Sequence, residues 1–254
     1  MTKDIGPILN GWPHEPGQVT VRKVRGVDGK IKIQLRVDLG LLQMESAGRP
    51  DGQRPYGCES MLGYLQKLLR HHRRAHGSGD GFALNPEQCE LLRAEAAQFY
   101  YRYLSEFVLG EYKAVVRDTG RNLDAMDFCR RYAAEDDDRE AMEQYRPYIL
   151  MMNTRGRAHL ALRGGRLRAA REAVRLGIKR IRKVFGESDE EELAAGSSEL
   201  ATLAALLREI ESKMPVDPVE QLQRKLAKAV EEERYEEAAR LRDLIRAAAN
   251  TDQQ

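Results

Sequence analysis

The chain has 254 residues, of which 42% are hydrophobic and 32% charged, a composition typical of a globular protein in water. Its 42 Lys and Arg residues nearly balance 40 Asp and Glu residues, which excludes a polycation that coats nucleic acid along its whole length. Its apolar runs, such as residues 149–152, are far shorter than the ~20 residues of a membrane span. Residues 1–7 lack the apolar stretch of a signal peptide, and the three cysteines form no CxxC pair. We therefore expect a cytoplasmic protein and exclude membrane, secreted and fibrous classes.

A β-hairpin is predicted over residues 18–45. Apolar and polar residues alternate strictly along residues 30–39, which predicts a strand with a buried apolar face and a polar outer face. A shorter alternation at residues 19–22 comes before it, and residues 26–29 are typical of a turn. Because a two-stranded hairpin is marginal in water, its apolar face must pack on a helix or a third strand, which residues 41–45 can supply.

From about residue 57 onward the chain is predicted to be helical. The first helix carries an apolar face and is followed by the basic stretch 70–81, which is predicted to be a loop. The second helix has Asn85 as its cap, Pro86 at the first position and Gln88 to complete a capping box, and it runs to about Leu109. Further helices are predicted over about residues 112–133, 146–163, 166–185 and 197–213. Acidic residues at 135–138 are predicted to separate two of these helices, and those at 187–192 are predicted to form a linker.

Two segments, about 86–123 and 147–185, share the order of helix, glycine-containing turn and returning helix. In the second segment, small residues suit a closely packed helix pair: Ala158, Ala161, Ala170 and Gly177. The layout is TPR-like, but the turn glycines Gly110 and Gly165 lie 55 residues apart, against roughly 34 in that repeat. We therefore predict αα-hairpins and not a regular repeat array.

The tail predicts a short helical hairpin with one apolar side. Asp217 can cap the first helix, Pro218 begins it, and Glu220 closes the box. The apolar residues lie in two stripes at helical spacing, Val219, Leu222, Leu226 and Val230, then Tyr235, Ala238, Leu241, Ile245 and Ala248. A hairpin of about 33 residues rarely buries enough surface to be stable alone. Its apolar face should therefore meet the rest of the chain, a second copy or another protein.

The tail also resembles the UVR motif, a helical hairpin shared by the excision-repair subunits UvrB and UvrC, by Clp-type chaperone subunits and by the McsA adaptor. The run aromatic-Glu-x-Ala-Ala-x-Leu-Arg-Asp-x-Ile of that motif stands here at residues 235–245, and the leading Asp-Pro and the leucine spacing also fit. The resemblance covers residues 217–249 and implies a protein–protein interaction module that pairs with a like hairpin. Together with Val230 of the first stripe, it gives these partner-binding candidates: Leu222, Leu226, Tyr235, Ala238, Ala239, Leu241, Arg242, Asp243 and Ile245.

Outside the tail the chain departs from these relatives. It has no Gly-rich phosphate loop, no helicase motifs and no nuclease carboxylate pattern, so it is not UvrB or UvrC itself. It also lacks the paired CxxC zinc modules of McsA.

A basic helix is the main competing signal. Residues 155–183 hold eleven Lys and Arg residues and a single acid, Glu172. The residues on one face could contact several phosphates: Arg168, Arg171, Arg175, Lys179 and Arg182. The alternative is a solvated face that pairs with nearby acids, and no aromatic residues lie between the basic positions to stack on bases. Nucleic-acid binding is therefore considered but not favoured.

No catalytic or metal site is predicted. His72 and His76 lie one helical turn apart, but Arg73 and Arg74 between them oppose a cation. The three cysteines, Cys58, Cys89 and Cys129, have no recognisable partner base and are expected to be structural thiols. With no acid–base pair or triad in view, we expect a non-enzymatic protein without a cofactor.

These observations predict an α+β chain dominated by helix, with three regions. Residues 1–56 hold the β-hairpin, residues 57–214 a helical body of TPR-like αα-hairpins, and residues 215–254 the UVR-type hairpin. The expected function is a cytoplasmic bacterial adaptor or scaffold that docks through its tail. Its partner would be an excision-repair subunit or a Clp-type chaperone with a UVR-type hairpin, or a second copy of the chain. The alternative is a DNA-associated accessory factor of nucleotide excision repair, in which the basic helix contacts phosphate.

Overall fold

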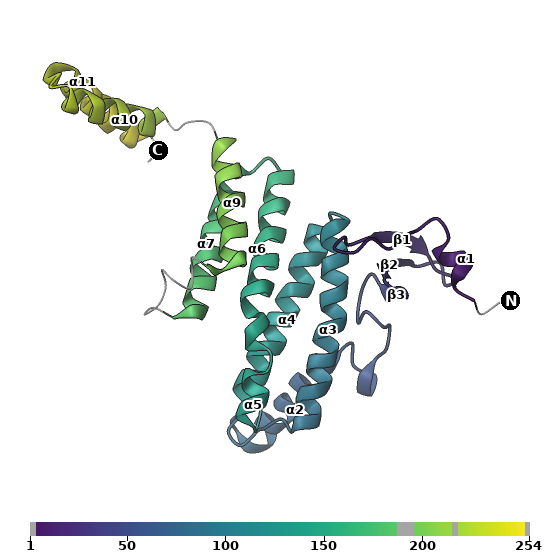
Figure 1. Ribbon diagram of the computed structural model, residues 1–254. Helices are drawn as coiled ribbons and strands as arrows, with labels where there is room; N and C mark the ends of the chain where they lie inside the picture. The colour runs from purple at the N-terminus through teal and green to yellow at the C-terminus, as the bar shows by residue number, and fades with distance from the viewer. Residues whose placement is uncertain (1–3, 187–195, 215–217, 252–254) are drawn as a thin grey trace. The chain divides into compact units, whose positions relative to one another are not determined.

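The computed structural model describes residues 4–186, 196–214 and 218–251, and it is mostly helical with one small sheet (Figure 1). The chain divides into two compact units, Met1–Glu209 and Ile210–Gln254. The predicted fold class is confirmed, because a three-stranded antiparallel sheet stands near the N-terminus and a helical hairpin near the C-terminus. The predicted acidic linker at residues 187–192 lies outside the described residues.

The sheet follows the short helix α1 (Gly6–Leu9) and consists of β1 (Val21–Arg25), β2 (Ile31–Val37) and β3 (Gly40–Glu45), in that spatial order. The third strand that the sequence offered at residues 41–45 is therefore present. Ile33 on β2 pairs with Lys23 on β1 and with Met44 on β3. The central strand is shorter than the alternation indicated: it ends at Val37, and Leu39 lies in the β2–β3 turn with 91% of its surface exposed. Asp38 and Leu39 continue the alternating pattern in the sequence, although they belong to the turn and not to the strand.

The apolar face of the sheet is covered by a helix end. Its core consists of Ile33, Leu35 and Met44, and Leu109 at the end of α3 packs against it. The expectation of a solvent-facing polar side on β2 is wrong, because Lys32 and Gln34 are only 8% and 6% exposed. Polar side chains from the neighbouring strands and from the β1–β2 turn cover them. The Lys32 ammonium pairs with Asp28 of that turn and with Glu45, and the Gln34 amide bonds with Arg22 and Gln43.

Helix α2 (Met61–His76) follows the short turn η1 (Pro55–Gly57). Buried Glu95 of a neighbouring helix accepts hydrogen bonds from the backbone N–H groups of Met61 and Leu62, at 2.7 and 3.2 Å, and so caps the first turn. The predicted loop at residues 70–81 is wrong for its first part, since α2 continues to His76 and ends at Gly77 with a φ of 76°. Basic side chains favour a helix C-terminus, and glycine adopts this left-handed cap without strain.

Helices α3 (Pro86–Val108) and α4 (Tyr112–Tyr132) form the first antiparallel pair. The predicted capping box is confirmed: Gln88 N–H donates to Asn85 Oδ1 at 2.8 Å, and Asn85 N–H donates to Gln88 Oε1 at 3.1 Å. The acidic residues 135–138 do end α4, but most of them form the short helix α5 (Asp136–Glu140), followed by the turn η2 (Glu143–Tyr145).

Helices α6 (Arg146–Arg163) and α7 (Leu167–Phe185) form the second pair, and α4 packs against α6, so that α3, α4, α6 and α7 lie side by side in this order (Figure 1). The four small residues predicted to allow close packing are all buried. A Cβ atom on Gly177 would lie 2.2 Å from Thr154 Oγ1, so the α6–α7 contact depends on that glycine.

Helix α9 (Ser198–Ser212) buries Leu200, Leu203 and Leu206, and the division between the two compact units falls within it. The second unit contains the helices α10 (Pro218–Glu231) and α11 (Tyr235–Thr251). None of the helices in the described ranges is long and apolar enough to cross a membrane.

Candidate functional site

The C-terminal hairpin reverses direction at a three-residue turn between α10 and α11. Glu233 in this turn has a φ of 56°, a left-handed conformation that glycine usually occupies. Two backbone hydrogen bonds close the end of α10: Arg234 N–H donates to the Ala229 carbonyl at 2.7 Å, and Glu233 N–H donates to the Val230 carbonyl at 3.1 Å. This is a Schellman arrangement, and it brings the two helices together as a pair.

The interior of the hairpin is small. Ala229, Ala238 and Leu241 are buried, and Leu222 and Leu226 pack against them. Two facing alanines let the helix backbones approach closely, as the sequence predicted for Ala238. Leu222, Leu226, Ala238 and Leu241 are therefore confirmed as members of the apolar stripes. Most of this interior serves to hold α10 against α11.

Several apolar side chains of the hairpin remain exposed instead. Val230 is 52% exposed, Tyr235 66% and Leu244 54%, and Ala239 is also exposed. The sequence placed Val230 and Tyr235 in the stripes, and the structure corrects both positions. On α10 the stripe continues from Leu226 to Ala229, three residues later, and turns Val230 outward. Tyr235 begins α11 directly after the turn, before the helix faces α10.

Leu244 was missed by the sequence reasoning. It follows Leu241 by three residues, a spacing that usually keeps two side chains on one helix face, and a helical-wheel plot would have flagged it as a flank of the stripe. Ile245, a predicted partner-binding residue, is half-buried, whereas Arg242 and Asp243 are exposed. The side chains of Val219 and Ala248 lie outside the described residues.

Charged residues surround the exposed apolar side chains. At the turn, Arg234 pairs with Glu232 and, at 2.5 Å, with Glu237. Farther along α11, Arg242 Nε lies 3.8 Å from Asp243 Oδ1, and both side chains are at least 60% exposed. Such exposed pairs contribute little to stability and exchange partners readily. A partner surface can therefore offer new ion pairs to Arg242 and Asp243 at little cost.

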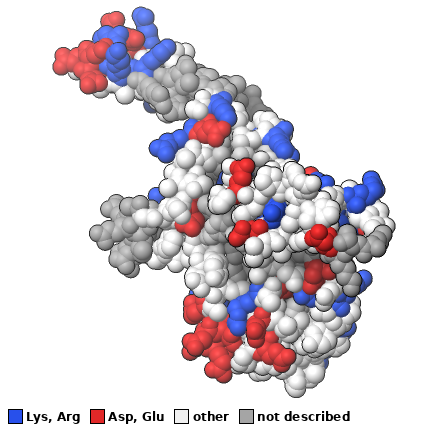
Figure 2. All heavy atoms as spheres, turned by 45° about the vertical axis from the view of Figure 1, so that its right-hand side comes forward, with Lys and Arg blue, Asp and Glu red and all other residues white. Residues whose placement is uncertain are grey.

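The basic residues of α7 lie on its outer side, as the sequence indicated. Arg168, Arg175, Lys179 and Arg182 are exposed and Arg171 is half-buried, whereas Ala170, Val174, Gly177 and Ile181 are buried. The single acid Glu172 lies 3.3 Å from Arg171 and 3.8 Å from Arg175. On the face drawn in Figure 2, acidic side chains gather at the end of the helical body where α5 lies. Positive and negative side chains are therefore separated in the first unit. The outer side of α7 is basic, and the end of the helical body at α5 is acidic.

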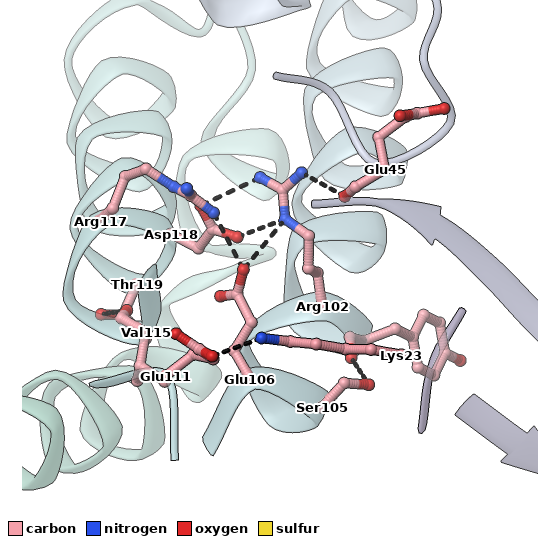
Figure 3. Close-up of polar contacts among 11 residues, drawn as sticks. Lys23, Glu45, Arg102, Ser105, Glu106, Glu111, Val115, Arg117, Asp118 and Thr119 are labelled. Carbon is pink, nitrogen blue, oxygen red and sulfur yellow. Dashed lines mark hydrogen bonds and ion pairs between the residues drawn. The ribbon is translucent and has the colours of Figure 1, made fainter. Parts of the chain in front are cut away.

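A buried cluster of charges on α3 and α4 was not predicted (Figure 3). Arg102 on α3 donates to both carboxylate oxygens of Asp118 on α4, at 2.6 and 3.0 Å, and both side chains are 1% exposed. Arg102 Nη1 also donates to the Glu45 carbonyl of β3 at 3.0 Å. A single guanidinium therefore joins the sheet to both helices of the first pair. Sequence reasoning missed it because the three residues come from three separate elements.

Glu106 completes this cluster. Its Oε1 accepts a hydrogen bond from Arg117 at 3.0 Å, whereas its Oε2 is buried without a hydrogen-bond partner in the described structure. Burial, and then the negative charge of Asp118, raise the pKa of Glu106 to about 8. A raised carboxyl pKa can mark an acid catalyst, but Glu106 and Asp118 have side-chain exposures of only 2% and 1%. The burial of these carboxylates favours a structural role in joining the sheet and helices.

The other residues singled out by the sequence include two close pairs, His72 with His76 and Cys89 with Cys129. His72 Nε2 lies 2.8 Å from the Asp80 carbonyl, next to the ring of His76. Cys89 and Cys129 are buried, and burial raises the pKa of both thiols, that of Cys129 to about 12. Cys58 is half-buried. Among the residues that the structure describes, no group of three or more His, Cys, Asp or Glu side chains is placed to hold a metal ion.

Comparison with known protein families finds one match: residues 217–250 match the UvrB/uvrC motif. The match covers both helices of the C-terminal hairpin and agrees with the resemblance drawn from residues 217–249. Comparison with curated proteins and with solved structures finds no match to the chain. The chain therefore carries a UVR motif, a helical hairpin known for protein–protein interaction, in a short segment near its C-terminus.

Proposed function

We propose that the protein is a non-catalytic adaptor or scaffold that docks on a protein partner through the α10–α11 hairpin. The observation that carries the proposal is the exposure of Val230, Tyr235 and Leu244 on a hairpin that matches a known interaction motif. The burial of Glu106 and Asp118 in the α3–α4 charge cluster supports a role without catalysis.

The physical need for a partner follows from the size of the hairpin. Its interior contains two alanines and a few leucines, and among the side chains that the structure describes three large apolar ones remain in water. Burying such a side chain fully contributes roughly 1.5–3 kcal/mol. A partner that covers Val230 and Tyr235 therefore stabilises both the complex and the hairpin itself. Leu244 follows Tyr235 by nine residues, about 180° around α11, and so lies on another side of the helix.

The chemistry of this surface fits a helical partner. A second helical hairpin can cover Val230 and Tyr235 in a four-helix packing, and Arg242 and Asp243 would fix its orientation by charge. Partners of this kind include an excision-repair subunit or a Clp-type chaperone with a UVR-type hairpin, and a second copy of this chain. A partner distinct from the chain itself is the expectation for an adaptor in the cytoplasm.

The proposal can be tested by affinity capture with three full-length baits. The first is unchanged, the second carries Val230→Asp and Tyr235→Asp, and the third carries Leu176→Asp on α7. Leu176 is 59% exposed, so it is a matched control for an apolar side chain lost from the surface outside the hairpin. We expect a partner that the first and third baits retain and the second loses. Retention of the same proteins by all three baits would contradict docking through this surface.

A second candidate function is phosphate contact by α7 in a DNA-associated accessory factor. It is favoured by the exposure of Arg168, Arg175, Lys179 and Arg182 along one helix. Such binding is distinguished by salt, because each phosphate contact adds about −0.9 to the slope of log affinity against log salt on duplex DNA. Binding through the hairpin should change little over the same range. A steep salt dependence whose slope falls in magnitude by about 1.8 in an Arg175→Gln, Lys179→Gln variant would support this second function.

A further inference from the structure

The first compact unit contains a cavity that neither the hairpin nor the basic helix explains. Its volume is about 550 Å³, and residues of α3, α4, α6 and the α5–η2 segment line it. This volume falls in the range of small-molecule sites, about 300–1,000 Å³. Four of the lining residues are tyrosines, Tyr100, Tyr103, Tyr145 and Tyr148, and apolar side chains such as Met126 and Ile149 form other parts of the wall.

The tyrosines give the cavity aromatic walls. The ring of Tyr100 stands edge-on to Tyr103, with centroids 5.6 Å apart, and lies 6.1 Å from the ring of Tyr148. Burial, and then the neighbouring Tyr100, raise the pKa of Tyr148 to about 12, and burial also raises the pKa of Tyr103. These phenols therefore stay neutral. Neutral aromatic walls favour a planar aromatic guest, which gains edge-to-face and stacking contacts.

One buried side-chain oxygen of a wall residue lacks a hydrogen-bond donor. The Asn122 side chain is 2% exposed, and its Nδ2 donates to the Ala96 carbonyl at 2.9 Å. Its Oδ1 is buried and has no hydrogen-bond partner in the described structure. Buried acceptors are normally satisfied, because leaving one unpaired is unfavourable. Asn122 lines the cavity, so a rotation of its side-chain amide toward the cavity would let a donor on a bound molecule satisfy this oxygen.

The charge of the wall is balanced. Arg93 is the charged residue among those lining the cavity, and its Nη1 lies 2.5 Å from Asp138 Oδ1. The pair leaves no uncompensated charge in the wall for either an anion or an organic cation. The ligand that fits is therefore neutral.

We propose that this cavity is a binding site for a neutral, planar aromatic small molecule that donates a hydrogen bond from a ring N–H to Asn122 Oδ1. The tyrosines enclose its ring, and Asn122 sets its orientation. The site lies in the first unit and is independent of docking through the hairpin, so either proposal can fail without the other.

The test uses three small probes with the full-length protein, followed by ligand-detected NMR titration. Indole has the required ring and N–H, benzofuran has the same shape without the donor, and tetramethylammonium is a cation. We expect saturable indole binding with a dissociation constant of about 0.1–1 mM, as suits so small a ligand. Benzofuran should bind about tenfold more weakly, and Asn122→Leu should abolish this difference. Equal binding of indole and benzofuran to the unchanged protein, or tighter binding of tetramethylammonium, would overturn the proposal.

The location is tested by a matched pair of variants on α3. Ala97 lines the cavity and is exposed, whereas Ala94 is exposed on the same helix but does not line it. Ala97→Trp should reduce indole binding at least tenfold, and Ala94→Trp should leave it unchanged. If circular dichroism shows that Ala97→Trp does not fold, Tyr145→Ala replaces it, since Tyr145 is a 57%-exposed wall residue. Indole binding that survives in the folded wall variant would place the ligand elsewhere and contradict the assignment.

Discussion

Arg102 and Asp118 form a bidentate ion pair between α3 and α4 in which each side chain is 1% exposed. The same guanidinium donates to the Glu45 carbonyl on β3. The first helix pair and the sheet are therefore fixed to each other through one buried charge. Removing Asp118 takes the bidentate partner from a buried guanidinium, whereas Asp118 would keep Arg117, whose Nε lies 2.6 Å from Asp118 Oδ1, if Arg102 were removed.

We expect Asp118→Asn to lower the free energy of unfolding by about 3–5 kcal/mol, as is typical when one member of a buried pair is removed. Asp136→Asn is the control, because the Asp136 side chain is 89% exposed and the same change there should cost less than about 1 kcal/mol. Urea denaturation followed by circular dichroism measures both. Similar effects of the two substitutions would contradict the expectation that the buried ion pair contributes more to the free energy of unfolding than an exposed carboxylate.

Glu106 should make the stability of the first unit depend on pH. Its pKa is about 8 in the folded chain against an ordinary value of 4.5, so the folded state holds a proton that the unfolded state releases. Stability should therefore fall as pH rises from about 4.5 to about 8, with a steepest slope of about 1.4 kcal/mol per pH unit from this group. Glu106→Gln should remove that slope. Denaturation at pH 5, 6.5 and 8 tests this, and parallel curves for the two proteins would contradict it.

Gly177→Ala should destabilise the α6–α7 pair, because the added Cβ would lie 2.2 Å from Thr154 Oγ1. We expect a loss of about 1–3 kcal/mol, typical of overpacking, in thermal or urea denaturation. Gly120→Ala on α4 is the matched control, since nothing lies within 4 Å of its added Cβ, and it should stabilise the helix by up to about 1 kcal/mol. Thr154→Ala combined with Gly177→Ala should recover part of the loss. The close-packing account fails if the two glycine substitutions have the same sign.

Glu233→Gly should stabilise the hairpin. Glu233 adopts a φ of 56°, which costs a side-chain-bearing residue more than glycine, so the gain should be about 0.5–1 kcal/mol. Amide hydrogen exchange of α10 and α11 in the full-length protein measures it as slower exchange. Ala227→Gly, at an exposed position within α10, should instead speed exchange. Faster exchange in the Glu233→Gly protein would mean that the left-handed turn is not a source of strain.

Local chemistry made much of the fold predictable. The sequence shows the capping box directly, because Asn85 and Gln88 are only three residues apart. It also shows the small residues of the α6–α7 pair, including Gly177. The same is true of the interior of the hairpin at Leu222, Leu226, Ala238 and Leu241. Predictions of exposure failed where residues elsewhere in the chain bury a side chain. The strand alternation predicts that Lys32 faces solvent, but its ion pairs with Asp28 and Glu45 bury it.

The candidate site shows the same limit. The motif located the hairpin, but the orientation of Val230 and Tyr235 depends on where α10 ends and α11 begins, and a one-residue difference moves a side chain by about 100° around a helix. Leu226 illustrates the consequence for experiments. It packs inside the hairpin, so an aspartate there would disrupt the fold of the hairpin as well as any interface. Arg102, Asp118 and Asn122 required tertiary structure to be recognised at all.

The central claim is that the C-terminal hairpin is the docking element, and affinity capture from cell lysate tests it most directly. Full-length protein is compared with a version that ends at Met214, at physiological salt and with nuclease added. We predict that at least one protein is retained by the full-length bait alone. If both baits retain the same proteins, the hairpin does not dock them, and the account is contradicted.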